Sequence, residues 1–108
     1  MIEYEIRMSE EEYPVPVAIF KDASYEMVGT FLLAEARSFG EEIMEALDAV
    51  CIGGRETDSF SGNVFSIEIS SDVTVIEDDI RGGRCRIGTR DLRVIVGDYC
   101  KRCSSEKP

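Results

Sequence analysis

Cysteines and clustered carboxylates are the side chains of this 108-residue chain that could do chemistry, because the sequence contains no histidine. Histidine is the most frequent general base and metal ligand, so both roles would fall to other residues. Cys100-x-x-Cys103 has the spacing of a redox dithiol. Together with Cys51 and Cys85, the pair also supplies the four thiolates that a structural zinc site needs.

The position of Cys100 and Cys103 argues against both kinds of chemistry. The pair falls at the end of a predicted helix, where the helix dipole opposes a thiolate, whereas reactive thiols sit at helix N-termini. Zinc sites usually show two close pairs of ligands, and this chain has one pair and two isolated cysteines. We therefore expect Cys51 and Cys103 to be small core residues on apolar helix faces, with Cys85 as a further candidate for the core.

The acidic run Glu77-Asp78-Asp79 follows a predicted strand, a place where hydrolases often carry carboxylates. No second motif completes a catalytic or metal-binding constellation, and no glycine-rich phosphate loop occurs. We predict that this run is a solvated strand end, that the protein binds no cofactor or metal, and that it is not an enzyme.

A second acidic group has a clear helical arrangement. At helical spacing, one side of the segment carries the apolar residues Ile43, Leu47 and Val50. The opposite side carries four acids, none with a Lys or Arg at position i+4: Glu41, Glu42, Glu45 and Asp48. A purely solubilising face more often mixes both signs of charge. Two interpretations stay open, a simple solvated face and a docking surface for a basic partner.

The N-terminal half has the pattern of two strands followed by helices. Apolar and polar residues alternate over residues 2–6, and residues 16–20 follow Pro14 as a second strand, so we expect an N-terminal hairpin. Residues 23–52 have a helical pattern that is split near Ser38-Phe39-Gly40. Ser38 and Glu41 have the spacing of a capping box, which predicts a new helix there.

The C-terminal half has a β pattern followed by a final helix. Short apolar runs at 64–70, 73–76 and 85–87 are separated by turn signals, which predicts a β-meander. The helix would begin at Thr89 as N-cap and carry an apolar stripe, with Gly97 costing about 1 kcal/mol relative to Ala. The fold class predicted is α+β, with an antiparallel sheet (N-terminal hairpin plus β-meander) and helices packed on one face. Residues 1–103 would form one domain and residues 104–108 a polar tail.

Charge is distributed unevenly along the chain. Residues 1–80 contain 19 Asp or Glu and 4 Lys or Arg, a balance of −15, whereas residues 81–108 contain 3 and 8, a balance of +5. Phosphate would repel the acidic part, which argues against direct nucleic-acid binding. No apolar run is long enough for a membrane span, and the N-terminal residues do not have the pattern of a signal peptide, so we expect a cytoplasmic protein.

The basic part has two interpretations. The arginines in question are Arg81, Arg84, Arg86, Arg90 and Arg93. Pairing with the chain's own acids is the favoured role, since the acidic remainder would otherwise repel itself. A second contact surface for nucleic acid or an acidic protein is the alternative.

Residues 62–103 carry the pattern of a resemblance. The segment runs from Gly62-Asn63-Val64-Phe65 through Asp72-Val73-Thr74-Val75 to Cys85-Arg86-Ile87-Gly88 and a closing helix. It resembles small acidic immunity proteins of bacterial contact-dependent inhibition and related toxin systems, some of which combine a β-meander, a few helices and an acidic surface. The resemblance implies a protein that binds and neutralises a cognate toxin, often a basic nuclease.

The functional hypothesis is therefore a non-catalytic immunity or inhibitor protein that recognises a basic protein by electrostatic complementarity. The residues predicted to contact that partner are Glu41, Glu42, Glu45, Asp48, Asp72, Glu77, Asp78 and Asp79. The alternative is a structural or adaptor domain that self-associates, for example as a homodimer, through a sheet edge or the last helix.

Overall fold

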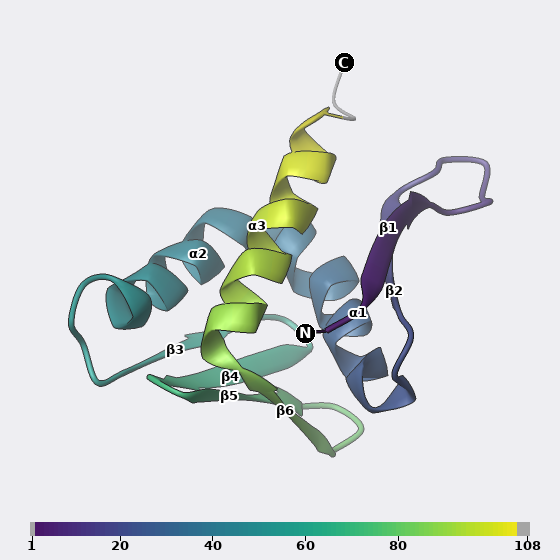
Figure 1. Cartoon of the computed structure of the whole chain (residues 1–108). Coiled ribbons are helices and arrows are strands. Elements are labelled where there is room, and N and C mark those ends of the chain that lie inside the picture. Colours follow the sequence, from purple (N-terminus) through teal and green to yellow (C-terminus); the bar gives the residue numbers. More distant parts are fainter. Residues whose placement is uncertain (1, 106–108) are drawn as a thin grey trace.

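The structure is a computed structural model that describes residues 2–105. Helices pack against two antiparallel sheets, so the predicted α+β class is confirmed (Figure 1). The elements in chain order are β1 (Tyr4–Met8), β2 (Pro16–Phe20), the 3-10 helix η1 (Ala23–Tyr25), α1 (Glu26–Phe31), the π-helix η2 (Leu32–Ala36), α2 (Arg37–Cys51), β3 (Thr57–Ser61), β4 (Phe65–Ser70), β5 (Val73–Asp78), β6 (Arg84–Gly88) and α3 (Thr89–Ser105).

The β-meander forms the larger sheet, with its four strands in the order β3-β4-β5-β6. Alternation along β4 follows the prediction, because Phe65, Ile67 and Ile69 are buried whereas Glu68 and Ser70 are exposed. Helices α2 and α3 cover the face to which these apolar residues point, and the opposite face is left to solvent (Figure 1).

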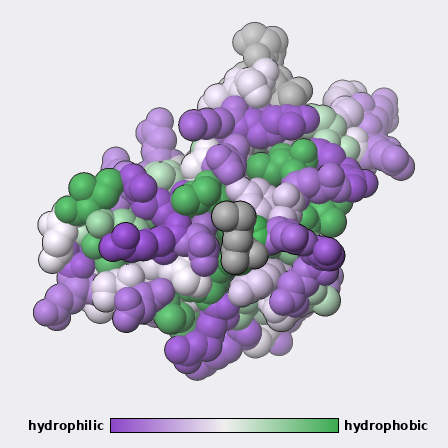
Figure 2. All heavy atoms as spheres, viewed as in Figure 1, coloured by the Kyte–Doolittle hydropathy of each residue, from purple (hydrophilic) through white to green (hydrophobic). Residues whose placement is uncertain are grey.

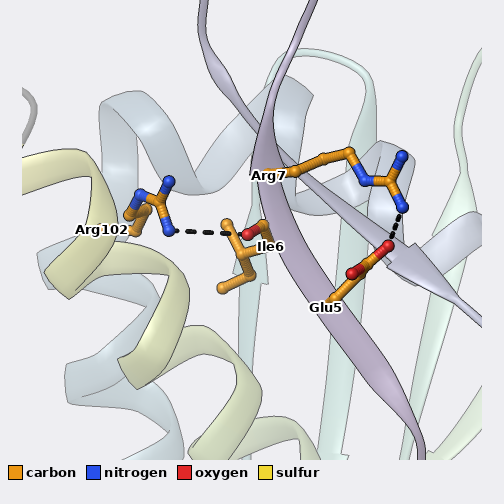
Figure 3. Close-up of polar contacts among 4 residues, drawn as sticks. All are labelled: Glu5, Ile6, Arg7 and Arg102. Carbon is orange, nitrogen blue, oxygen red and sulfur yellow. Dashed lines mark hydrogen bonds and ion pairs between the residues drawn. The ribbon is translucent and has the colours of Figure 1, made fainter.

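The N-terminal hairpin is also confirmed, but it forms a separate sheet of two strands. It packs on α3 through backbone carbonyls, since the buried Tyr99 hydroxyl donates to the carbonyl of Pro16 at 2.7 Å. The guanidinium of Arg102 donates to the carbonyl of Ile6 at 3.5 Å, as Figure 3 shows. On the hairpin itself, Arg7 forms an ion pair with Glu5 (Figure 3). The C-terminal half of α3 therefore anchors the hairpin.

The helical segment before β3 is split where the sequence predicts, near Ser38-Phe39-Gly40. Helical elements follow one another over Ala23–Cys51, and a kink falls at Phe39, whose φ of −121° and ψ of 27° are not helical. The predicted capping box does not form, because the Ser38 side chain makes no capping hydrogen bond within residues 2–105. Five-residue π spacing instead lets Phe31, Leu32 and Ala36 all face the core.

Helix α3 buries the predicted stripe of Leu92, Ile95, Val96 and Tyr99. The hydroxyl of Thr89 donates to the Ser70 carbonyl at 2.6 Å, so the first residue of α3 is tied to the sheet. The helix extends to Ser105 and includes the first two residues of the predicted tail, whereas residues 106–108 lie outside the described part. Within residues 2–105 we find no helix long and apolar enough to cross a membrane.

Candidate partner-binding surface

The acidic face of α2 is exposed as the sequence predicts. Glu41, Glu42 and Glu45 are exposed, whereas Ile43 and Leu47 on the opposite side are fully buried. None of the three glutamates takes part in an ion pair or hydrogen bond with another residue in 2–105. Their charges therefore extend into solvent without a neutralising cation, and they act on approaching molecules over about one Debye length, roughly 8 to 10 Å.

Asp48, the fourth predicted acid of α2, has a different environment. Its carboxylate lies 2.6 Å from Nε of Arg93, so it links α2 to α3. The hydrogen bond and the negative charge of Asp48 raise the pKa of Arg93 above its usual value. The sequence offered no cation at i+4, but the fold brings one from a helix 45 residues away in the chain. Part of the Asp48 charge is thus already compensated.

The acids at the end of β5 are used within the fold. Glu77 forms an ion pair with Arg84 on β6 at 3.8 Å. The Asp78 carboxylate accepts hydrogen bonds from the backbone N–H groups of Ile80 at 3.0 Å and Arg81 at 2.9 Å. The bond from the Arg81 backbone is the largest cause of a lowered pKa at Asp78. These contacts shape the β5–β6 turn.

Asp79 and Asp72 complete the predicted set at two different ends of the sheet. Asp79 accepts a hydrogen bond from the Ser66 hydroxyl at 3.0 Å, beside the β5–β6 turn. Asp72 is exposed in the β4–β5 turn, and its carbonyl accepts from the N–H of Thr89 at 3.0 Å. Strand β5 separates the two turns by roughly 20 Å at about 3.3 Å per residue. The eight predicted residues therefore do not form one continuous surface.

The acid most deeply embedded in the structure was absent from the predicted site. Glu35 lies in η2 with no exposed surface. Its carboxylate accepts three backbone N–H bonds from the β3–β4 turn, from Asn63 at 3.0 Å, Val64 at 2.7 Å and Phe65 at 2.7 Å. A Cβ atom on Gly62 would collide with this carboxylate, so the turn requires glycine at that position. Glu35 thus fixes the turn to the helical layer.

A signal for Glu35 does exist in the sequence. It follows Phe31 by four residues and therefore lies on the apolar side of a helix, where an acid needs a partner. The sequence interpretation placed Met27, Phe31 and Ala34 on that side. The π-helix rotates the face, so that Val28, Leu32, Glu35 and Ala36 are buried instead, while Met27 and Ala34 are only partly buried.

Two of the four thiols border a cavity. Cys100 and Cys103 lie in the last turns of α3, as predicted, and border a cavity of about 330 Å³ together with Ser38, Gly40 and Met44. A Cβ atom on Gly40 would lie 2.6 Å from Sγ of Cys100, so glycine makes room for the sulfur. Burial, and to a lesser extent Cys103, raises the pKa of Cys100, which disfavours the reactive thiolate.

The other two cysteines, Cys85 and Cys51, do not line this cavity. Cys85 is buried, as considered from the sequence, and its thiol donates to the Ser24 carbonyl at 3.4 Å. Cys51, at the end of α2, and Cys103, in α3, are only half-buried, so the expectation of core positions is met only in part for both. Residues 2–105 contain no group of three or more His, Cys, Asp or Glu side chains that could hold a metal ion.

Two of the five arginines considered in the basic part have the favoured role of pairing with the chain's own acids. Arg84 and Arg93 form the ion pairs described above. Arg81, Arg86 and Arg90 are exposed and form no side-chain ion pair within the described chain. Figure 2 shows that hydrophilic residues cover much of the visible surface, with apolar patches scattered between them. Comparison with family models, curated proteins and solved structures gives no match for the chain.

Proposed function

We propose that this chain is a non-catalytic protein-binding domain that docks onto a basic partner through the exposed acids of α2. In its specific form, the proposal is a cytoplasmic immunity or inhibitor protein that neutralises a basic toxin such as a nuclease. The glutamates would then occupy the surface on which the toxin binds nucleic-acid phosphates, because both ligands present closely spaced negative charge.

One observation supports the α2 glutamates above four of the other predicted acids. Asp48, Glu77, Asp78 and Asp79 each have a polar partner inside the fold, whereas the three exposed glutamates of α2 have none in residues 2–105. Those three are Glu41, Glu42 and Glu45. A charge without an internal partner loses nothing within its own fold when it pairs with a cation on another molecule, and it steers the encounter of the two proteins.

The experiment uses a charge reversal on the helix with a matched reversal elsewhere. The triple variant Glu41→Lys/Glu42→Lys/Glu45→Lys would be compared with Glu10→Lys/Glu11→Lys/Glu12→Lys, which makes the same change of net charge in the exposed β1–β2 loop. The binding partner would be the basic C-terminal domain of a secreted protein encoded beside this chain. Association rates would be measured by stopped flow at low and at physiological salt.

We expect the helix variant to associate at least about tenfold more slowly at low salt, with a reduced salt dependence, since steering acts mainly on the association rate. The loop variant should lose much less. Equal losses in the two variants would show that net charge, and not the α2 face, governs binding. Unchanged rates in the helix variant would overturn the proposal.

A further inference from the structure

Strand β3 forms an open edge of the four-stranded sheet, since it pairs only with β4. The N–H of Gly62 bonds to the carbonyl of Phe65 at 2.8 Å, which sets the alternation of the antiparallel ladder. By that alternation the backbones of Asp58 and Phe60 face β4, whereas those of Thr57, Ser59 and Ser61 face outward. The outward groups could pair with another strand.

The hydrogen bonds of Ser59 support this assignment. Its backbone N–H donates to Oδ1 of Asp58 at 2.7 Å, a side chain of the preceding residue and not a carbonyl of β4. Asp58 also forms an ion pair with Arg55 at 3.4 Å. The central outward N–H of the edge therefore bonds within its own strand and not to another strand, and an added strand would replace the Asp58 carboxylate as its acceptor.

The two edges of the sheet differ in shape and in charge. The exposed side chains of β3 are the small hydroxyl residues Thr57, Ser59 and Ser61. At the other edge, β6 carries the exposed Arg84 and Arg86, and its Cys85 thiol is bonded to η1. Long basic side chains and a covering segment are common protections of an edge, and β3 has neither.

Negative charge surrounds the β3 edge. Glu56 and Asp58 flank or belong to the strand, and Glu68 lies directly opposite Ser59 on β4. Helix α2 contacts the strand through Phe39, whose ring lies 5.9 Å from the Phe60 ring of β3. Arg55 is the basic residue nearest in sequence, and it is already paired with Asp58.

We propose that β3 accepts an extended, basic segment of the partner protein as an added strand. The inference rests on the proposed function and names the mode in which the partner is held. Main-chain hydrogen bonds to the outward groups would provide affinity, and lysine or arginine side chains on the solvent face of the added strand would reach Glu68 across the small side chain of Ser59. A second copy of this chain fits less well, because two β3 edges would bring Glu56 and Asp58 of both copies together.

The test uses a synthetic octapeptide, Lys-Val repeated four times with blocked ends, titrated into the ¹⁵N-labelled full chain. We expect amide shifts at Thr57, Ser59 and Ser61, and binding to Ser59→Pro about tenfold weaker because outward hydrogen bonds are lost. Proline at this position keeps the β3–β4 ladder, since the Ser59 N–H does not bond to β4. The matched control is Arg86→Pro at the centre of the β6 edge, which should bind the peptide within about twofold of wild type.

A second measurement avoids any change in the protein. The same peptide with N-methylated valines keeps its charge but cannot form a strand ladder, and we expect it to bind the wild-type chain at least about tenfold more weakly. Equal binding of the methylated peptide, or shifts centred on β6, would overturn the inference. Dimerisation of the free chain with protected β3 amides would overturn it in favour of a second copy.

The failure of this inference can be separated from failure of the proposed function. If the α2 triple reversal weakens binding of the peptide but Ser59→Pro and N-methylation do not, strand addition is wrong and the acidic-face proposal stands. If neither the peptide nor the basic toxin domain binds, both are wrong.

Discussion

The acids of α2 and the acids at the end of β5 look equivalent in the sequence, since each is a short run of closely spaced carboxylates. In the structure Glu41, Glu42 and Glu45 have no internal partner within residues 2–105, whereas Glu77 and Asp78 are held by an arginine and by backbone N–H groups. The difference arises from backbone geometry. Inside a helix the N–H groups are already bonded, so exposed side chains find no donor there, but a turn leaves N–H groups that a nearby carboxylate satisfies.

The largest effect is expected at Glu35, whose carboxylate accepts three hydrogen bonds inside the fold. Glu35→Ala would leave three backbone N–H groups without this acceptor, one of them on the buried Phe65, so we expect a loss of about 3 to 5 kcal/mol in the free energy of unfolding. Urea denaturation followed by circular dichroism measures it. The control Glu45→Ala, on the exposed face, should change stability by less than about 0.5 kcal/mol. Similar losses in the two variants would remove the distinction between internal and exposed acids.

The next largest effect is expected from a substitution in α3 that changes stability but not charge. A Cβ atom on Gly97 of α3 would meet no other atom within 4 Å, so tight packing does not require the glycine. We expect Gly97→Ala to stabilise the protein by about 1 kcal/mol through helix propensity. Thermal unfolding would show it, and partner association should stay as in wild type. Slower association would mean that α3 also contacts the partner.

Acid titration tests the use of Asp78. The N–H bonds hold its pKa below the usual value, so the carboxylate contributes stability at pH values above the unfolded pKa, and this contribution is lost as pH falls through the lower folded pKa. In urea titrations we expect Asp78→Asn to be less stable than wild type at neutral pH and the two to converge as the pH falls below the folded pKa of Asp78. Glu41→Gln, on the free face, should run parallel to wild type over the same range. A constant difference for Asp78→Asn would contradict the role of its charge.

The smallest effect is expected from an alkaline titration of the hydrogen bond between Tyr4 and Asp98. The Tyr4 hydroxyl donates to Asp98, and burial, followed by this bond, raises the pKa of Tyr4 to about 12. A raised pKa means that the stabilisation is complete below the unfolded value near 10 and is lost as pH rises through 12. We expect the free energy of unfolding of Tyr4→Phe to fall less steeply than that of wild type between about pH 10 and 12. An unchanged decline would show that Tyr4 does not couple to hairpin docking.

Local patterns predicted most of the fold, because each of these elements has one buried and one exposed face. Alternation over residues 65–70 gave the central strand, and the stripe through Leu92, Ile95 and Tyr99 gave the last helix. The π-helix was missed because its signal is a shift of the apolar face by one residue, which a regular 3.6-residue period does not anticipate. The split near Ser38 was predicted correctly, since the helix is kinked at Phe39, but the capping box inferred from spacing alone does not form there.

The candidate surface was only partly predictable for a related reason. Helical spacing placed Glu41, Glu42 and Glu45 together correctly on the solvent side. Pairing of Asp48 with Arg93 and binding of the turn by Glu35 depend on contacts between residues far apart in the chain. The open edge at β3 follows from the strand order, which the meander pattern suggests. The charge around this edge could not be predicted, because it depends on which residues the fold brings beside the strand.

The three hydrogen bonds of Glu35 also have a consequence for the order of folding. A β-hairpin normally closes within microseconds from residues that are neighbours in sequence, but here the turn obtains its acceptor from a residue 28 to 30 positions earlier. The turn at Asn63 and Val64 can therefore reach its final form only after the helical segment has come against it. We expect φ-values near the β3–β4 turn to match those of η2, so that this contact connects the two halves of the chain in the folding transition state.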